Sequence, residues 1–116
     1  MLGSKRSLRV GDMILKEISE MLIKGNIRDP RIESVVLTGI KLTDDLGFAR
    51  VYFTVIGDEI DKEKIMEGLQ SATSYIKREL SRRLRVRRIP DLRFEFDEIL
   101  QEGYRVDELL RKTKRE

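Results

Sequence analysis

Basic side chains crowd residues 77–93, which contain eight lysine and arginine residues and only two acidic ones. This segment therefore carries a net charge of +6, whereas the whole chain of 116 residues carries only +3. A guanidinium group can bind phosphate through two parallel hydrogen bonds, so such a concentration favours a polyanion, and nucleic acid in particular. A solvated helix face with ion pairs is the usual alternative, but too few carboxylates lie nearby in the sequence to neutralise the segment. The candidate binding residues are Ser74, Tyr75, Lys77, Arg78, Arg82, Arg83, Arg85, Arg87 and Arg88.

The helical phase of this region defines a contact face. Ile76, Leu80 and Leu84 are spaced as the buried stripe of a helix, so the opposite side should face solvent. Arginine there can bridge phosphates, and tyrosine can stack on an unpaired base, although the ring of Tyr75 can equally well pack in the core. The residues that this phase turns outward are Ser71, Tyr75, Arg78, Arg82 and Arg85.

Catalysis and metal binding find little support in the composition. The chain has no histidine and no cysteine, which removes the commonest general base, the thiolate nucleophile, zinc–cysteine sites and disulfides. Asp44 and Asp45, together with Asp97, would suit a metal-dependent nuclease, but aspartates in a hairpin loop are far more often turn formers. We therefore expect no enzyme activity, no catalytic residue, no metal and no cofactor.

The first half of the chain is expected to form a helix and a hairpin. Apolar residues at steps of three and four predict an amphipathic helix that begins after Ser4 or Ser7 and ends at Gly25. Residues 34–43 and 49–56 are rich in β-branched and apolar side chains, as strands are. These elements would be followed by the helix that carries the basic segment.

That second helix is expected to begin at Asp58 or Asp61 and to continue to Pro90. A kink or break is predicted at residues 71–74, where hydroxyl side chains compete for backbone hydrogen bonds. In the hairpin loop, Gly47 is available for a positive φ angle.

The order of elements predicts the fold. Residues 92–96 alternate apolar and charged side chains as a third strand does, and a crossover through the helix would place this strand parallel to the second. The expected fold is α+β, a single KH-like domain of type II with the order α-β-β-α-kink-α-β and a three-stranded mixed sheet that has helices on one face. Residues 1–97 would form this RNA-binding domain, and residues 98–116 a short C-terminal helix and basic tail.

Further candidate contacts lie outside the basic helix. Tyr52 should face the side of the sheet without helices, near Arg93 on the neighbouring strand. Lys5, Arg6 and Arg9 at the N-terminus either add phosphate contacts or are simply solvated.

Three segments give a family resemblance. In order along the chain they read IRDPRI (residues 27–32), TDDLGFARVY (43–52) and RRIPDLRFEFD (87–97), and Arg9-Val10 precedes them. Together they resemble the ribosome-binding factor A family. The resemblance implies a bacterial, non-catalytic assembly factor that binds the small ribosomal subunit and its rRNA, assists rRNA 5′-end maturation and matters most in the cold.

One family feature differs in this chain. Ordinary KH domains hold RNA with a Gly-x-x-Gly loop, and no two glycines of this chain have that spacing. The family replaces the loop with a kinked helix around Ala-x-Gly, where this chain has Ala72-Thr73-Ser74. Because serine is more strained than glycine in an unusual backbone conformation, a milder or displaced kink is expected.

Three classes of function remain open at this stage. The first is the assembly factor, which we expect to be cytoplasmic, free of any membrane and monomeric when it is off the ribosome. The second is an independent regulator that binds RNA or DNA, which selective binding to short oligonucleotides would favour. The third and least supported is the magnesium-dependent nuclease.

Overall fold

A computed structural model of the chain describes residues 4–57 and 60–98. The predicted C-terminal helix therefore lies outside the described residues. The elements follow the expected order: α1 (Lys5–Ile23), the 3₁₀ helix η1 (Pro30–Ile32), β1 (Val35–Leu42), β2 (Phe48–Val55), α2 (Lys62–Arg83) and β3 (Asp91–Phe96).

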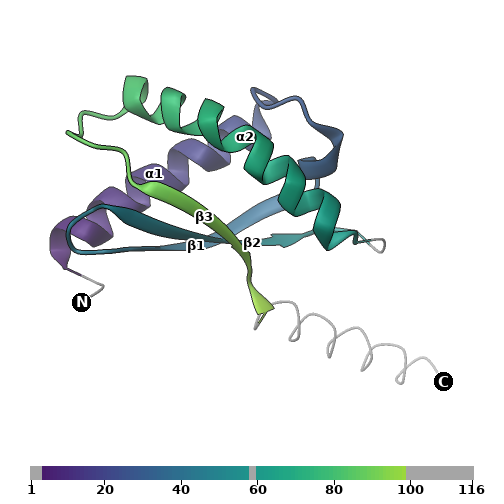
Figure 1. Cartoon of the computed structure of the whole chain (residues 1–116), viewed down its shortest axis with the longest axis horizontal. Helices are drawn as coiled ribbons and strands as arrows, with labels where there is room; N and C mark the ends of the chain where they lie inside the picture. Colours follow the sequence, from purple (N-terminus) through teal and green to yellow (C-terminus); the bar gives the residue numbers. More distant parts are fainter. Residues whose placement is uncertain (1–3, 58–59, 99–116) are drawn as a thin grey trace.

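The predicted α+β fold with a mixed sheet is confirmed. The strands are arranged in the order β1-β2-β3, with β1 antiparallel and β3 parallel to the central β2. Both helices lie on one side of this sheet (Figure 1). No helix in the described part of the chain is long and apolar enough to cross a membrane.

Capping side chains fix where the helices begin. The hydroxyl of Ser4 accepts a hydrogen bond from the backbone N–H of Ser7 at 3.1 Å and caps α1. The carboxylate of Asp61 accepts one from the N–H of Lys64 at 3.2 Å and caps α2. Beyond α1, Gly25 has a φ of 71°, which ends the helix as expected.

The hairpin loop between β1 and β2 differs from expectation at one residue. The positive φ belongs to Leu46, at 60°, and not to Gly47. Asp45 explains this, because its Oδ1 accepts hydrogen bonds from the Thr43 hydroxyl at 2.6 Å and the Gly47 N–H at 2.9 Å. This local turn places the Leu46 side chain in the core, where burial offsets the backbone strain.

α2 is one continuous helix, so the break expected at residues 71–74 is absent, whereas a kink there stays a prediction. The Thr73 hydroxyl donates to the carbonyl oxygen of Leu69 at 2.8 Å and therefore bonds within the helix. Ala72 packs in the buried stripe of α2, and burial of that stripe against the sheet stabilises the helix through this region.

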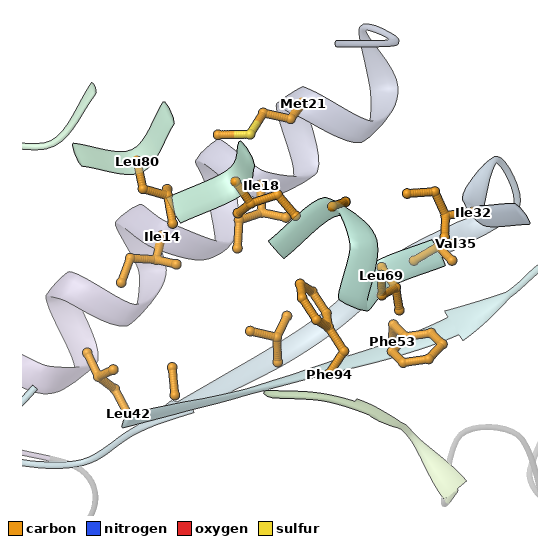
Figure 2. Packing of buried hydrophobic residues seen from close by; sticks show 14 of the residues in the cluster. Ile14, Ile18, Met21, Ile32, Val35, Leu42, Phe53, Leu69, Leu80 and Phe94 are labelled. Atoms are coloured by element: carbon orange, nitrogen blue, oxygen red, sulfur yellow. The ribbon is translucent and has the colours of Figure 1, made fainter. Parts of the chain in front are cut away.

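The core fills the space between the helices and the sheet. Figure 2 shows Ile14 and Ile18 of α1 and Leu69 of α2 above Phe53 and Phe94 of the strands. Phe53 is fully buried, and its ring centroid lies 4.4 Å from that of the partly buried Phe96. This layer holds the outer face of α2 and the segment that follows it in fixed positions on the molecule.

Candidate nucleic-acid interface

The outer face of α2 carries part of the predicted site. Ile76 and Leu80 are fully buried, and Ser74, Arg78 and Arg82 on other sides of the helix are exposed, as their spacing predicts. This face therefore presents two arginines and a serine hydroxyl to solvent.

The rest of the basic cluster lies on a loop and not on the helix. Leu84 is the C-terminal cap of α2 and has extended backbone angles, φ −109° and ψ 140°, so the expected helix over residues 84–90 is wrong. On a helix Leu84 and Val86 would point about 200° apart, whereas in an extended chain both can face the core. Both side chains do pack against the core, as does Ile89.

We call residues 84–90 the arginine loop. Its apolar residues anchor it, since Leu84 and Pro90 are buried and Val86 and Ile89 are half-buried. Its three arginines are exposed between these anchors: Arg85, Arg87 and Arg88. The loop thus holds three guanidinium groups outward on a backbone fixed by packing.

Ion pairs occupy some of the predicted binding residues. Arg82 lies 3.1 Å from Glu79, and Arg83 lies 3.5 Å from Glu79 and 3.3 Å from Glu17 of α1. Glu17 is 66 residues away from Arg83 in the sequence, so local reading of the segment could not find this carboxylate. The expectation that too few carboxylates were available is therefore wrong for Arg83, which the tertiary structure neutralises.

Lys77 of α2 also forms an ion pair, with Asp91 at the start of β3. Its ammonium donates a hydrogen bond of 2.8 Å to Asp91 and holds the pKa of that carboxyl below its ordinary value, with a smaller contribution from the Arg88 charge. The pKa of Asp45 is lowered too, first by the hydrogen bonds from Thr43 and Gly47 and to a smaller extent by Arg88. Because both carboxylates stay ionised, they offset part of the Arg88 charge.

The remaining arginines form the part of the cluster that has no ion pairs in the described structure. Within residues 4–57 and 60–98, Arg78, Arg85, Arg87 and Arg88 have no carboxylate within ion-pair distance. Arg88 lines an open cleft of about 550 Å³ together with residues of the hairpin loop. These four side chains are the strongest candidates for phosphate contacts.

The N-terminus of α1 lies at the same end of the molecule. The backbone N–H of Ser4 donates to Asp44 of the hairpin loop at 3.3 Å, and the N–H of Asp91, which follows the arginine loop, donates to the Gly47 carbonyl at 3.0 Å. The three segments lie near one another at that end (Figure 1). The first turn of α1 has no acidic residue, so its helix dipole adds to the positive potential there.

The basic residues at the N-terminus of α1 therefore lie near the arginine loop. Lys5, Arg6 and Arg9 are all exposed. Arg6 precedes Glu17 by about three turns, which puts it on the side of α1 that faces Arg83 of α2. The sequence alone could not choose between solvation and a binding role for these residues, because the choice depends on which loops lie nearby.

The two tyrosines in the described residues have different environments. Tyr75 is half-buried and packs against the core, so only part of its ring is available for stacking. Tyr52 alternates with the buried Val51 and Phe53 of β2 and therefore lies on the face of the sheet without helices.

The structure offers no metal centre among the residues it describes. No group of three or more acidic side chains there is placed to hold an ion. Asp45 acts as a turn former, as expected, and Asp44 accepts the hydrogen bond from the Ser4 N–H. What the arrangement can do chemically is bind anions.

Comparisons with known proteins support the family resemblance. The family model described as ribosome-binding factor A matches residues 6–110. A ribosome-binding factor A of Geotalea uraniireducens is 44% identical over 92% of this chain and 87% of its own. The chain also resembles the crystal structure of ribosome-binding factor A from Thermus thermophilus, with a TM-score of 0.69 and 22% identity over 78% of this chain and 93% of that one.

A second Thermus thermophilus comparison is a homology model of ribosome binding factor A that was fitted into a cryo-EM map of a complex with the 30S subunit. Its TM-score to this chain is 0.54, with 25% identity over 71% of this chain and 89% of that one. The family match covers nearly all of the sequence, and the solved crystal structure shares the fold. The chain therefore belongs to the ribosome-binding factor A family.

Proposed function

We propose that this protein is a non-catalytic assembly factor that binds the small ribosomal subunit through its rRNA. The observation that carries the proposal is the arginine loop. Its three arginines project from a backbone anchored by buried apolar residues, and none of them has an ion pair in the described structure. Such a surface is complementary to a phosphate backbone.

Family membership supports the same partner. A Thermus thermophilus relative was fitted into a map of its 30S complex. We extend that partner to this chain, and with it the family's expected role in maturation of the rRNA 5′ end, especially at low temperature. Small subunits mature in the cytoplasm, which is where the protein would act.

The chemistry of the surface suits backbone recognition. Guanidinium groups bind phosphates irrespective of sequence, so these contacts fix the position of the protein on folded RNA but do not read bases. Arg78 and Ser74 on α2 extend the arginine loop along the helix. Because the loop is packed and not free, little conformational entropy is lost when it binds.

The direct test is the salt dependence of binding to purified small subunits. Each phosphate contact releases counterions and contributes about 0.7–0.9 to the slope of log affinity against log salt. The triple variant Arg85→Gln, Arg87→Gln, Arg88→Gln should therefore bind weakly at moderate salt, with a slope lower by about two to three units. Circular dichroism should show an unchanged fold, because the side chains point away from the core.

A matched control removes the same charge elsewhere. Lys16, Lys24 and Lys64 are exposed and lie outside the proposed surface. Changing these three lysines to glutamine should leave the slope nearly unchanged. If both triple variants lower affinity and slope equally, only overall charge matters and the assigned surface is wrong.

A further inference from the structure

The second face of the sheet carries its own group of charged and aromatic side chains. Both helices pack on the opposite face (Figure 1), and no described element covers this one. The central strand β2 contributes Arg50 and Tyr52, and β3 contributes Arg93 and Glu95 on the same side. Lys41 of β1 completes the group, with its Nζ 5.8 Å from the centroid of the Tyr52 ring.

Two like charges are direct neighbours on this face. Arg50 and Arg93 are cross-strand partners in the parallel ladder of β2 and β3. Like charges in that position destabilise a sheet unless something compensates them. The positions are not dictated by packing, because the two side chains are 51% and 65% exposed.

A single carboxylate, that of Glu95, lies near both Arg50 and Arg93. Oε1 of Glu95 lies 3.9 Å from Nε of Arg50 and 3.5 Å from Nε of Arg93. These distances are longer than a good charge-assisted hydrogen bond, so each guanidinium keeps most of its donor capacity. With Lys41 included, three cations share this face with the carboxylates of Glu95 and Asp97, so the group keeps a net positive charge and attracts a further negative charge.

The tyrosine lies beside this pair. Tyr52 is two residues from Arg50 on the same face of β2, a spacing of about 6.6 Å along the strand. Its side chain is half-buried and lies on the central strand, on a face that no described helix covers. One aromatic surface next to two guanidinium groups matches the two chemical parts of a nucleotide, the base and the phosphate.

We propose that this face, which we call the sheet site, binds one unpaired nucleotide of RNA. Arg50 and Arg93 would take the phosphate, and Tyr52 would stack on the base. The sheet site adds a second RNA contact to the proposed function and rests on that function for its partner. Because it lies on the side of the sheet away from the helices, the protein would hold two RNA segments at once, and each contact would raise the effective concentration of the other.

RNA fits this surface better than an acidic peptide does. A peptide carboxylate would pair with the arginines but would gain nothing from the tyrosine. An acidic strand would also meet Glu95 and Asp97 on β3 and just after it, where successive peptide charges would be repelled. A single phosphate beside a neutral base avoids that repulsion.

The experiment uses the full chain, a six-nucleotide single-stranded RNA and hexaglutamate as an acidic peptide probe. Backbone amide shifts in NMR titrations report each position separately. The RNA should shift the amides of Arg50, Tyr52 and Arg93, and hexaglutamate should leave the Tyr52 amide in place. Equal shifts from both probes, or RNA shifts confined to the arginine loop, would overturn the proposal.

Two substitutions test the roles of individual groups. Tyr52→Leu keeps an apolar side chain but removes the ring, and it should weaken RNA binding at the sheet site about five-fold or more. Glu95→Gln removes the carboxylate that competes for both arginines, and it should tighten binding about two- to five-fold. An unchanged affinity in either variant, with the fold intact by amide dispersion, would contradict the assignment.

A matched control separates the local effect of Glu95 from a change in total charge. Glu33 is exposed, and none of the hydrogen bonds or ion pairs found within residues 4–57 and 60–98 involves its carboxylate. Glu33→Gln should leave the RNA affinity of the sheet site unchanged, and equal tightening in both variants would refute local competition. The two proposals can fail independently of each other. The sheet site is tested by the shift of the Tyr52 amide on addition of free RNA, whereas the arginine loop is tested by binding to small subunits.

Discussion

Single carboxylates fix several loops of this protein. Asp29 illustrates the point, because it caps η1 by accepting a hydrogen bond from the N–H of Arg31 at 3.0 Å and also accepts three from the guanidinium group of that residue. The Arg31 side chain holds the pKa of Asp29 below its ordinary value of 3.8. The guanidinium group of Arg31 is thus engaged in holding this turn.

The pH dependence of stability should reveal this pair. Since the pKa of Asp29 is lowered in the folded state, its stabilisation is present above the unfolded value and is lost as the pH falls through the folded one. Asp29→Asn keeps the cap but removes the charge, so it should lower the melting temperature at pH 7. The difference from the parent protein should shrink towards zero as the pH falls through the lowered pKa of Asp29.

A control at an exposed aspartate of α1 makes the measurement specific. Asp12 of α1 is exposed, and no ion pair within the described residues involves it. Asp12→Asn should change the melting temperature little at either pH. A destabilisation by Asp29→Asn that is equally large at pH 7 and at a pH low enough to protonate Asp29 in the folded protein would show that the charge of Asp29 is irrelevant.

At the scale of elements, one glycine allows η1 to pack on α2. A Cβ atom added at Gly68 would lie 2.7 Å from Cγ2 of Ile32 and 3.1 Å from Cβ of Arg31. Gly68→Ala should therefore destabilise the protein by about 1–3 kcal/mol, even though alanine favours a helix by about 1 kcal/mol. Denaturant unfolding measures the change.

The exposed Gln70 of the same helix provides the comparison. Gln70→Ala should leave the free energy of unfolding within about 0.5 kcal/mol of the parent value. If Gly68→Ala is instead as stable as Gln70→Ala, η1 can shift without cost and the close approach does not matter.

The elements also show how far the sequence predicts this structure. Periodicity located α1, all three strands and the start of α2 to within a few residues, because each element buries one regular face. The break at residues 71–74 was wrong because burial of the whole stripe of α2 outweighs the local preference of its hydroxyl residues. The end of α2 was misplaced because Leu84 fits the helical period and the extended alternation of the arginine loop equally well.

The candidate site was predictable in composition but not in arrangement. The basic residues of 77–93 were evident from charge counts, and four of them prove to have no ion pair in the described structure. Which four residues lack an ion pair depends on the pairs that Lys77 forms with Asp91 and Arg83 forms with Glu17. These pairs form only in the folded chain. The sheet site depends likewise on the register of β2 and β3.

The whole molecule has a basic end and no described catalytic centre. The chain lacks histidine and cysteine, and its described carboxylates form no metal-binding group. The proposed non-catalytic role predicts that purified protein cleaves no RNA and hydrolyses no nucleotide, with or without magnesium. Turnover that is abolished by Asp44→Asn or Asp45→Asn would refute the non-catalytic role.

The most direct measurement of the central claim locates the basic end on the small subunit. Because the chain has no cysteine, a single one can be introduced at exposed Ser81, next to the arginine loop, or at exposed Asn26 beyond the far end of α1. An iron chelate attached to Ser81→Cys should cleave the small-subunit rRNA strongly at a few adjoining sites, and the same chelate on Asn26→Cys should cleave it weakly. Strong cleavage from Asn26→Cys with none from Ser81→Cys would contradict the account.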